Sequence, residues 1–161
     1  MTPQDFVAQV VRPNVREFHA NVGSLRHAYN AVFAVDALAA HLHWWLKSND
    51  SGSTTPSQTD DSYRTELGKA NDAYALLHNI ANAQKHVRLT RRNPRVDTAE
   101  QITSRRIGYG EGGYGDGRYG GVGQVVVDVG GDGLLYVETI VNSALAFLEA
   151  ELAKVSGQVD T

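Results

Sequence analysis

The stretch LRHAYNAVFAVDALAAHLHWWLK, residues 25–47, decides the fold of this chain. Its apolar residues recur at the three- and four-residue spacing of a helix, and they form two faces instead of one. Ser24 stands directly before the stretch, where a helix N-cap is expected. The predicted helix must therefore pack against other elements along both faces. The first face is Ala28, Val32, Val35, Ala39, Leu42 and Leu46, and the second is Phe33, Ala40 and Trp44.

Further helices are predicted on both sides of this one. Residues 60–87 have one apolar face at helical spacing, so we expect a single long helix there. A final helix is predicted over about 139–155. At the N-terminus we expect two short helices, because Pro13 removes a backbone N–H and disfavours a continuous one.

Two β-rich runs precede the final helix. Residues 124–129 (QVVVDV) and 134–138 (LLYVE) flank the turn sequence Gly-Gly-Asp-Gly, a pattern typical of a β-hairpin. The sequence therefore predicts a mainly α (α+β) protein, an antiparallel helical bundle with a β-hairpin before the C-terminal helix. We expect one domain over residues 1–161, because the length suits a single hydrophobic core.

Composition restricts the classes of protein to consider. The 161 residues carry a net charge of −3 and include no cysteine, which excludes disulfides and thiolate metal sites. The first eleven residues lack the basic start of a signal peptide, and the apolar run at 31–46 is too short and too polar to span a bilayer. We therefore expect a soluble cytoplasmic protein without membrane contact.

Two segments are predicted to be loops. Residues 48–59 are polar, and residues 104–123 are rich in glycine and tyrosine, a composition typical of a flexible loop. The second segment is either a flexible insertion beside the hairpin or a segment whose tyrosines stack on nucleobases.

The long helix at 25–47 also carries candidate catalytic residues. Asp36 and His43 lie between its two apolar faces, so we expect both side chains to be at least partly buried. A buried carboxylate needs a partner, and the candidates are His43, Lys85 and His86. Such a link could simply fix the register of the helices, or it could charge a histidine that acts as an acid or a base.

A polar strip follows the helix predicted at 60–87. Its members can bind a phosphate, orient a hydroxyl or move a proton, or they can be the solvated side of an amphipathic helix. The strip consists of Arg64, Asn71, His78, Asn82 and His86, with Lys85 at its border.

Basic residues are concentrated between positions 85 and 106, although the whole chain is acidic. A local positive field of this kind attracts nucleic acid or another polyanion, unless the acidic remainder of the chain neutralises it. The predicted polyanion-binding residues are Lys85, Arg88, Arg91, Arg92, Arg105 and Arg106.

The segment Asn82-Ala83-Gln84-Lys85-His86, together with two long helices, a basic loop and a further helix, resembles HEPN-like helical bundles of prokaryotes. Many members of that group are RNases. The group's signature is an arginine four to six residues before a histidine, whereas here Asn79 or Asn82 precedes His86. The resemblance implies RNA as the partner, His86 as general base for a ribose 2′-hydroxyl, and Asn82 and Lys85 as the residues that hold the phosphate.

Two other functions fit the same residues. The chain could be a non-enzymatic interaction protein, for example a homodimer formed through the helix pair. Alternatively, its six histidines and its aspartates could build a metal site in a bundle enzyme, although no close pair of the HxxxH type is present. We predict no cofactor.

Overall fold

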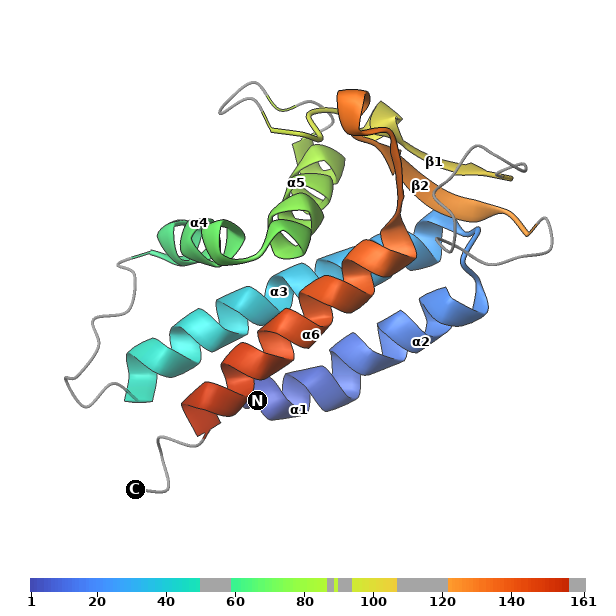
Figure 1. Ribbon diagram of the computed structural model, residues 1–161. Coiled ribbons are helices and arrows are strands. Elements are labelled where there is room, and N and C mark those ends of the chain that lie inside the picture. The colour runs from blue at the N-terminus through green and yellow to red at the C-terminus, as the bar shows by residue number, and fades with distance from the viewer. Residues whose placement is uncertain (50–58, 87–88, 90–93, 107–121, 157–161) are drawn as a thin grey trace.

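The computed structural model describes residues 1–49, 59–86, 89, 94–106 and 122–156. It is mainly helical, with a small antiparallel sheet at one end, as the sequence predicts (Figure 1). The helices are α1 (Pro3–Phe6), α2 (Arg12–Ala20), α3 (Leu25–Asn49), α4 (Asp60–Ala70), α5 (Asp72–His86) and α6 (Val137–Ser156). The strands are β1 (Ile102–Arg105), β2 (Gln124–Asp128) and β3 (Leu134–Tyr136).

Helix α3 lies at the centre of the bundle. It contacts α2, α4, α5 and α6, which explains why its sequence is apolar on more than one face. Figure 1 shows α2 running antiparallel to α3, with α6 alongside and α5 packed against α3 and α6. The apolar side chains of these helices form one continuous core with those of the sheet, and Leu38, Leu42 and Leu77 are fully buried in it.

The N-terminal helix does not break at Pro13, which corrects the expectation of two separate short helices. A π-helical turn, η1 (Val7–Val11), joins α1 to α2, and its wider spacing lets the Arg12 N–H donate to the carbonyl of Val7. The Asn14 side chain donates to the Val10 carbonyl at 2.8 Å. The irregular turn and this side chain accommodate the proline within a continuous helical segment.

The helix predicted at 60–87 is two helices. Helix α4 ends at Ala70, and Asn71 adopts an extended backbone with φ −149° and ψ 115°. The Asn71 side-chain oxygen accepts a hydrogen bond from the Tyr74 N–H at 2.9 Å, and it thereby caps the start of α5. Figure 1 shows that the chain changes direction sharply at this point.

The predicted hairpin is present and gains a third strand. In β2 and β3, Val126 pairs with Tyr136 and Asp128 with Leu134. Gly130 and Gly133, in the connecting turn, have positive φ angles of 71° and 83°, which glycine adopts without strain. Strand β1 pairs with the other edge of β2, in the order β1-β2-β3.

The loop boundaries differ from those predicted. Residues 48 and 49 still belong to α3, so the first loop begins later than expected. Ser104 and Arg105 belong to β1, because they pair with Val125 and Gln124. Most of the rest of the two predicted loops, residues 50–58 and 107–121, lies outside the described residues.

Candidate functional site

The carboxylate of Asp36 is the centre of a polar cluster between three helices. Its side chain is only 2% exposed, in the middle of α3. Its Oδ1 atom lies 2.6 Å from Arg64 Nη1 of α4 and 2.8 Å from His78 Nδ1 of α5. Its Oδ2 atom lies 3.7 Å from Lys85 Nζ, also of α5. We call Asp36, Arg64, His78, Asn82 and Lys85 the Asp36 cluster.

Arg64 ties α4 to α3 through both its charge and its hydrogen bonds. Its Nη1 atom also donates to the backbone carbonyl of Asp36 at 2.8 Å, and its Nε atom donates to Asp60 Oδ2 at 3.0 Å. The side chain is 11% exposed. A guanidinium buried to this degree requires such partners, and here it has two carboxylates.

His78 connects Asp36 to Asn82. Because an ionised carboxylate only accepts hydrogen bonds, His78 Nδ1 carries the proton that Asp36 accepts. His78 Nε2 then accepts from the Asn82 amide at 3.0 Å. The ring is stacked on Tyr74, with their centroids 6.1 Å apart and their planes 13° apart. An imidazole fixed in this way has one defined tautomer and one defined orientation.

The partners of Asp36 determine its ionisation. Burial alone would raise its pKa, but the hydrogen bond from His78 and the positive charges of Arg64 and Lys85 outweigh burial. The pKa of Asp36 is therefore held below its usual value of 3.8. Nearby, burial and the charge of Asp36 raise the pKa of Tyr74, so this phenol remains neutral at physiological pH.

Lys85 is the most exposed member of the cluster. Its side chain is 48% exposed, and its ammonium lies 5.6 Å from the centroid of the Phe33 ring. At 3.7 Å from Asp36 it is the least tightly held of the carboxylate's three neighbours. His86 follows it at the end of α5 and is exposed.

The structure brings together three of the five residues that the sequence predicted as catalytic, Asp36, Asn82 and Lys85, and places His43 and His86 elsewhere. Lys85 contacts Asp36 as predicted, and Asn82 joins the cluster through His78. The proposed partnership of Asp36 with His43 is wrong, because residues seven apart on one helix are separated by about 10 Å along its axis. No hydrogen bond or ion pair between His86 and Asp36 is present in the described part of the chain.

His43 instead lies in the apolar core. Its side chain is fully buried, its ring lies 5.4 Å from the Trp44 ring and 5.6 Å from the Tyr63 ring, and neither ring nitrogen has a hydrogen-bond partner among the described residues. This environment offers no route for proton exchange with solvent. His43 is therefore a packing residue.

The predicted polyanion-binding residues fall into separate places. Arg88, Arg91 and Arg92 lie outside the described residues. Arg105 and Arg106 are exposed at the end of β1, beside the start of α3, where the Ser104 hydroxyl donates to the Gly23 carbonyl. Lys85 lies beside Asp36, eleven residues into α3 from Leu25, which corresponds to about 16 Å along the helix axis. The members of this set that the structure describes, Lys85, Arg105 and Arg106, do not form one compact pocket.

The sequence predicts Arg64 and His78 as members of the polar strip but does not identify them as partners of Asp36. The useful signal was the buried position of Asp36, which requires partners from other helices. The break at Asn71 decides which side chains can reach it, and that break was not predicted.

Within the described ranges, no group of three or more histidine, aspartate and glutamate side chains could hold a metal ion. Across the same ranges, no helix is both long enough and apolar enough to cross a membrane. Comparisons with protein-family models, with curated proteins and with solved structures find no match for this chain.

Proposed function

We propose that this protein binds RNA or another polyanion through the C-terminal end of α5 and the basic residues that follow it. The observation that carries the proposal is the position of Lys85. Its ammonium is exposed at the edge of the Asp36 cluster, while Asp36 is already occupied by Arg64 and His78. Lys85 can therefore contact a phosphate without leaving a buried carboxylate unpaired.

The spread of the basic residues supports a polymer as the ligand. Lys85 lies beside Asp36, and Arg105 and Arg106 follow Ser104 beside the start of α3, two places that are about 16 Å apart along the axis of α3. A polyanion with repeated phosphates can contact both ends, whereas a single small anion cannot. The resemblance to HEPN-like bundles, many of which act on RNA, points in the same direction.

Binding can be tested by fluorescence anisotropy with a short labelled single-stranded RNA. We expect Lys85→Gln to weaken binding roughly tenfold, as for the loss of one charge-assisted hydrogen bond. A plot of log K for RNA binding against log salt concentration has a negative slope, and the loss of one phosphate contact should make it shallower by about 0.7. Lys69→Gln, at an exposed position of α4, changes the net charge equally and should have little effect. RNA binding that is independent of salt would contradict the proposal.

A second candidate function is RNA cleavage, with His78 as the general base. The observation that favours it is the 2.8 Å contact of His78 Nδ1 with Asp36, which leaves Nε2 as the basic nitrogen. Asn82 would have to release Nε2 for a ribose hydroxyl to approach it. This assignment replaces His86, for which the described part of the chain provides no carboxylate partner.

The two histidines can be distinguished by RNA turnover. If His78 is the base, His78→Ala should abolish RNA cleavage, whereas His86→Ala should cleave RNA at the wild-type rate. Thermal denaturation of both variants checks that they are folded. Equal turnover by wild type and His78→Ala would exclude this candidate but would leave RNA binding intact.

A further inference from the structure

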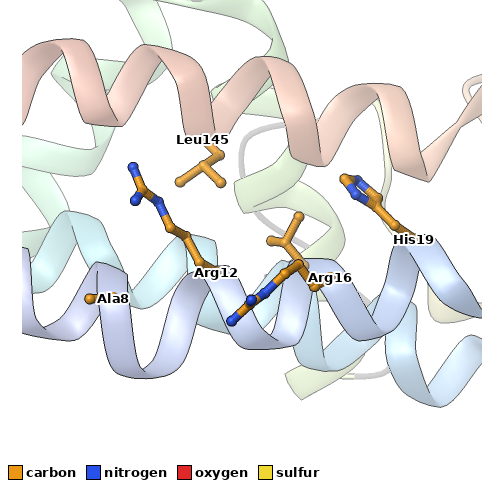
Figure 2. Close-up of a pocket in the computed structure, with 6 residues that line it drawn as sticks. Ala8, Arg12, Arg16, His19 and Leu145 are labelled. Atoms are coloured by element: carbon orange, nitrogen blue, oxygen red, sulfur yellow. The ribbon is translucent and has the colours of Figure 1, made fainter.

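A groove between α2 and α6 holds basic residues that do not belong to the Asp36 cluster. It has a volume of about 370 Å³. Figure 2 shows Arg12 and His19 reaching from α2 toward α6 at the two ends of the groove, with Leu145 of α6 between them and Arg16 along the outer side of α2. The lining residues are Ala8, Arg12, Val15, Arg16, His19 and Leu145.

The continuity of the helical segment through Pro13 is what brings these residues to one face. Arg12, Arg16 and His19 are spaced by four and three residues, so a regular helix aligns them along one side. The lining also contains apolar surface, since Val15 is buried beneath these side chains and Leu145 is half-buried opposite. The groove thus combines positive charge with an apolar floor.

The two ends of the groove are fixed by α6. Arg12 Nε donates to Glu149 Oε1 at 3.2 Å. His19 Nε2 lies 2.8 Å from Asn142 Oδ1 and 3.9 Å from Glu138 Oε1. These contacts orient Arg12 and His19 before any ligand binds, which lowers the entropic cost of binding.

Arg16, by contrast, is not neutralised. It is exposed, and within the described part of the chain it has no hydrogen bond or ion pair. The described residues that line the groove include no carboxylate. The groove therefore presents an uncompensated guanidinium beside a second guanidinium, although the whole chain carries a net charge of −3.

We propose that this groove binds a phosphate monoester that carries a small aromatic or aliphatic group. The planar guanidinium of Arg16, which has no carboxylate partner among the described residues, suits the oxygens of a terminal phosphate, and the second negative charge of that phosphate favours a monoester over a diester. Val15 and Leu145 receive the organic group. The groove volume lies near the lower end of the range of about 300–1,000 Å³ that small-molecule sites occupy, so the ligand is a small ester.

Isothermal titration calorimetry with phenyl phosphate at constant ionic strength tests the proposal. We expect phenyl phosphate to bind more tightly than inorganic phosphate, which lacks the organic group. It should bind much more tightly than phenol, which lacks the phosphate. Arg16→Gln should weaken phenyl phosphate roughly tenfold. Lys69→Gln, which removes an equal charge from α4, should leave the affinity unchanged.

Three further measurements keep the test independent of folding and of RNA binding. The methyl NMR signals of Val15 and Leu145 should shift on titration with phenyl phosphate, and they should keep their free-state positions in unliganded Arg16→Gln. Lys85→Gln should retain the wild-type affinity for phenyl phosphate even where it weakens RNA binding. Equal affinities of Arg16→Gln and Lys69→Gln, or equal affinities for phenyl phosphate and inorganic phosphate, would overturn the proposal.

Discussion

Asp36 illustrates how one buried charge fixes the positions of two other helices. A carboxylate in an apolar helix would be costly without compensation. Arg64 and His78 supply that compensation from α4 and α5, so each helix is attached to α3 at a defined point along its length. The same contacts leave Lys85 at the surface, where it is available to a ligand. The structural role and the proposed binding role of the cluster are thus compatible.

Replacing Asp36 by asparagine should reveal how much this charge contributes. Asp36→Asn keeps the size of the side chain but leaves Arg64, which is 11% exposed, without its nearest carboxylate. We expect the free energy of unfolding in urea to fall by about 3 kcal/mol, as for a buried ion pair that loses one partner. Glu66→Gln removes an exposed carboxylate from α4 and should change stability little.

The pH dependence of this difference follows from the pKa of Asp36. That pKa is lower in the folded protein than the usual value of 3.8, so the unfolded chain takes up the proton first as the pH falls. The stabilisation by Asp36 is therefore complete above about pH 5, and it is lost as the pH falls through the depressed folded value. Urea titrations of wild type and Asp36→Asn should differ by a constant amount near neutrality and converge in acid. A difference that grows in acid would contradict this assignment.

His43 should behave in the opposite way. Its two ring nitrogens are buried without a hydrogen-bond partner among the described residues. Burying them unpaired lowers the free energy of unfolding. We expect His43→Leu, a change to an apolar side chain of similar size, to raise the free energy of unfolding by about 1 kcal/mol. Circular dichroism during thermal denaturation would measure the change. A loss of stability would show that the imidazole is needed where it lies.

At the scale of helices and strands, local signals identified most elements but not their interruptions. Ser24 before α3 and the glycine turn before β3 are decided by nearby residues, so the sequence predicts these features correctly. Strand β1 carries no such signal, since only Ile102 is buried and its remaining side chains are exposed. It is a strand because β2 offers a free edge, and this is a property of the tertiary fold.

The break between α4 and α5 was missed because apolar spacing continues across it. Asn71 followed by Asp72 is nevertheless a typical start of a helix, an N-cap residue followed by an acidic first turn. Periodicity alone cannot show whether such a pair interrupts a helix or lies on its solvated side. The change of direction at Asn71 brings both Arg64 and His78 to Asp36.

Asn71→Ala tests this interruption. The variant loses the hydrogen bond to the Tyr74 N–H, and we expect a loss of about 1 kcal/mol, typical of an N-cap. Asn30→Ala, at an exposed position inside α3, should be neutral or slightly stabilising because alanine favours a helix. If Asn71→Ala were more stable than wild type, the cap would not be what determines the break.

At the scale of the whole molecule, the sheet is attached to the helical bundle through the turn before α3. The Val125 N–H of β2 donates to the Val22 carbonyl at 2.8 Å, and the Ser104 hydroxyl of β1 donates to the Gly23 carbonyl. The buried valines of β2 continue the helical core. Composition and periodicity predict a hairpin and a bundle but not the place where they meet, because no local pattern encodes this contact.

Gly23→Ala should loosen this attachment. A Cβ atom at Gly23 would lie 2.5 Å from the Gly123 carbonyl oxygen and 3.0 Å from its carbon, and this backbone can yield only if the sheet shifts. We expect the free energy of unfolding to fall by about 1–3 kcal/mol, as for an overpacked contact. The Val125 amide should exchange with deuterium faster than in wild type, because its bond to Val22 depends on the same approach.

The matched control is a second glycine-to-alanine change, for which we expect the opposite effect on the free energy of unfolding. Gly68 lies within α4, and a Cβ atom there would meet the Ala75 side chain at an ordinary 3.5 Å. Gly68→Ala should therefore stabilise the protein by up to about 1 kcal/mol through helix propensity alone. If both variants changed stability in the same direction, steric contact at Gly23 would not be what joins the sheet to the bundle. Opposite signs, with faster exchange at Val125 confined to Gly23→Ala, are the result that this packing requires.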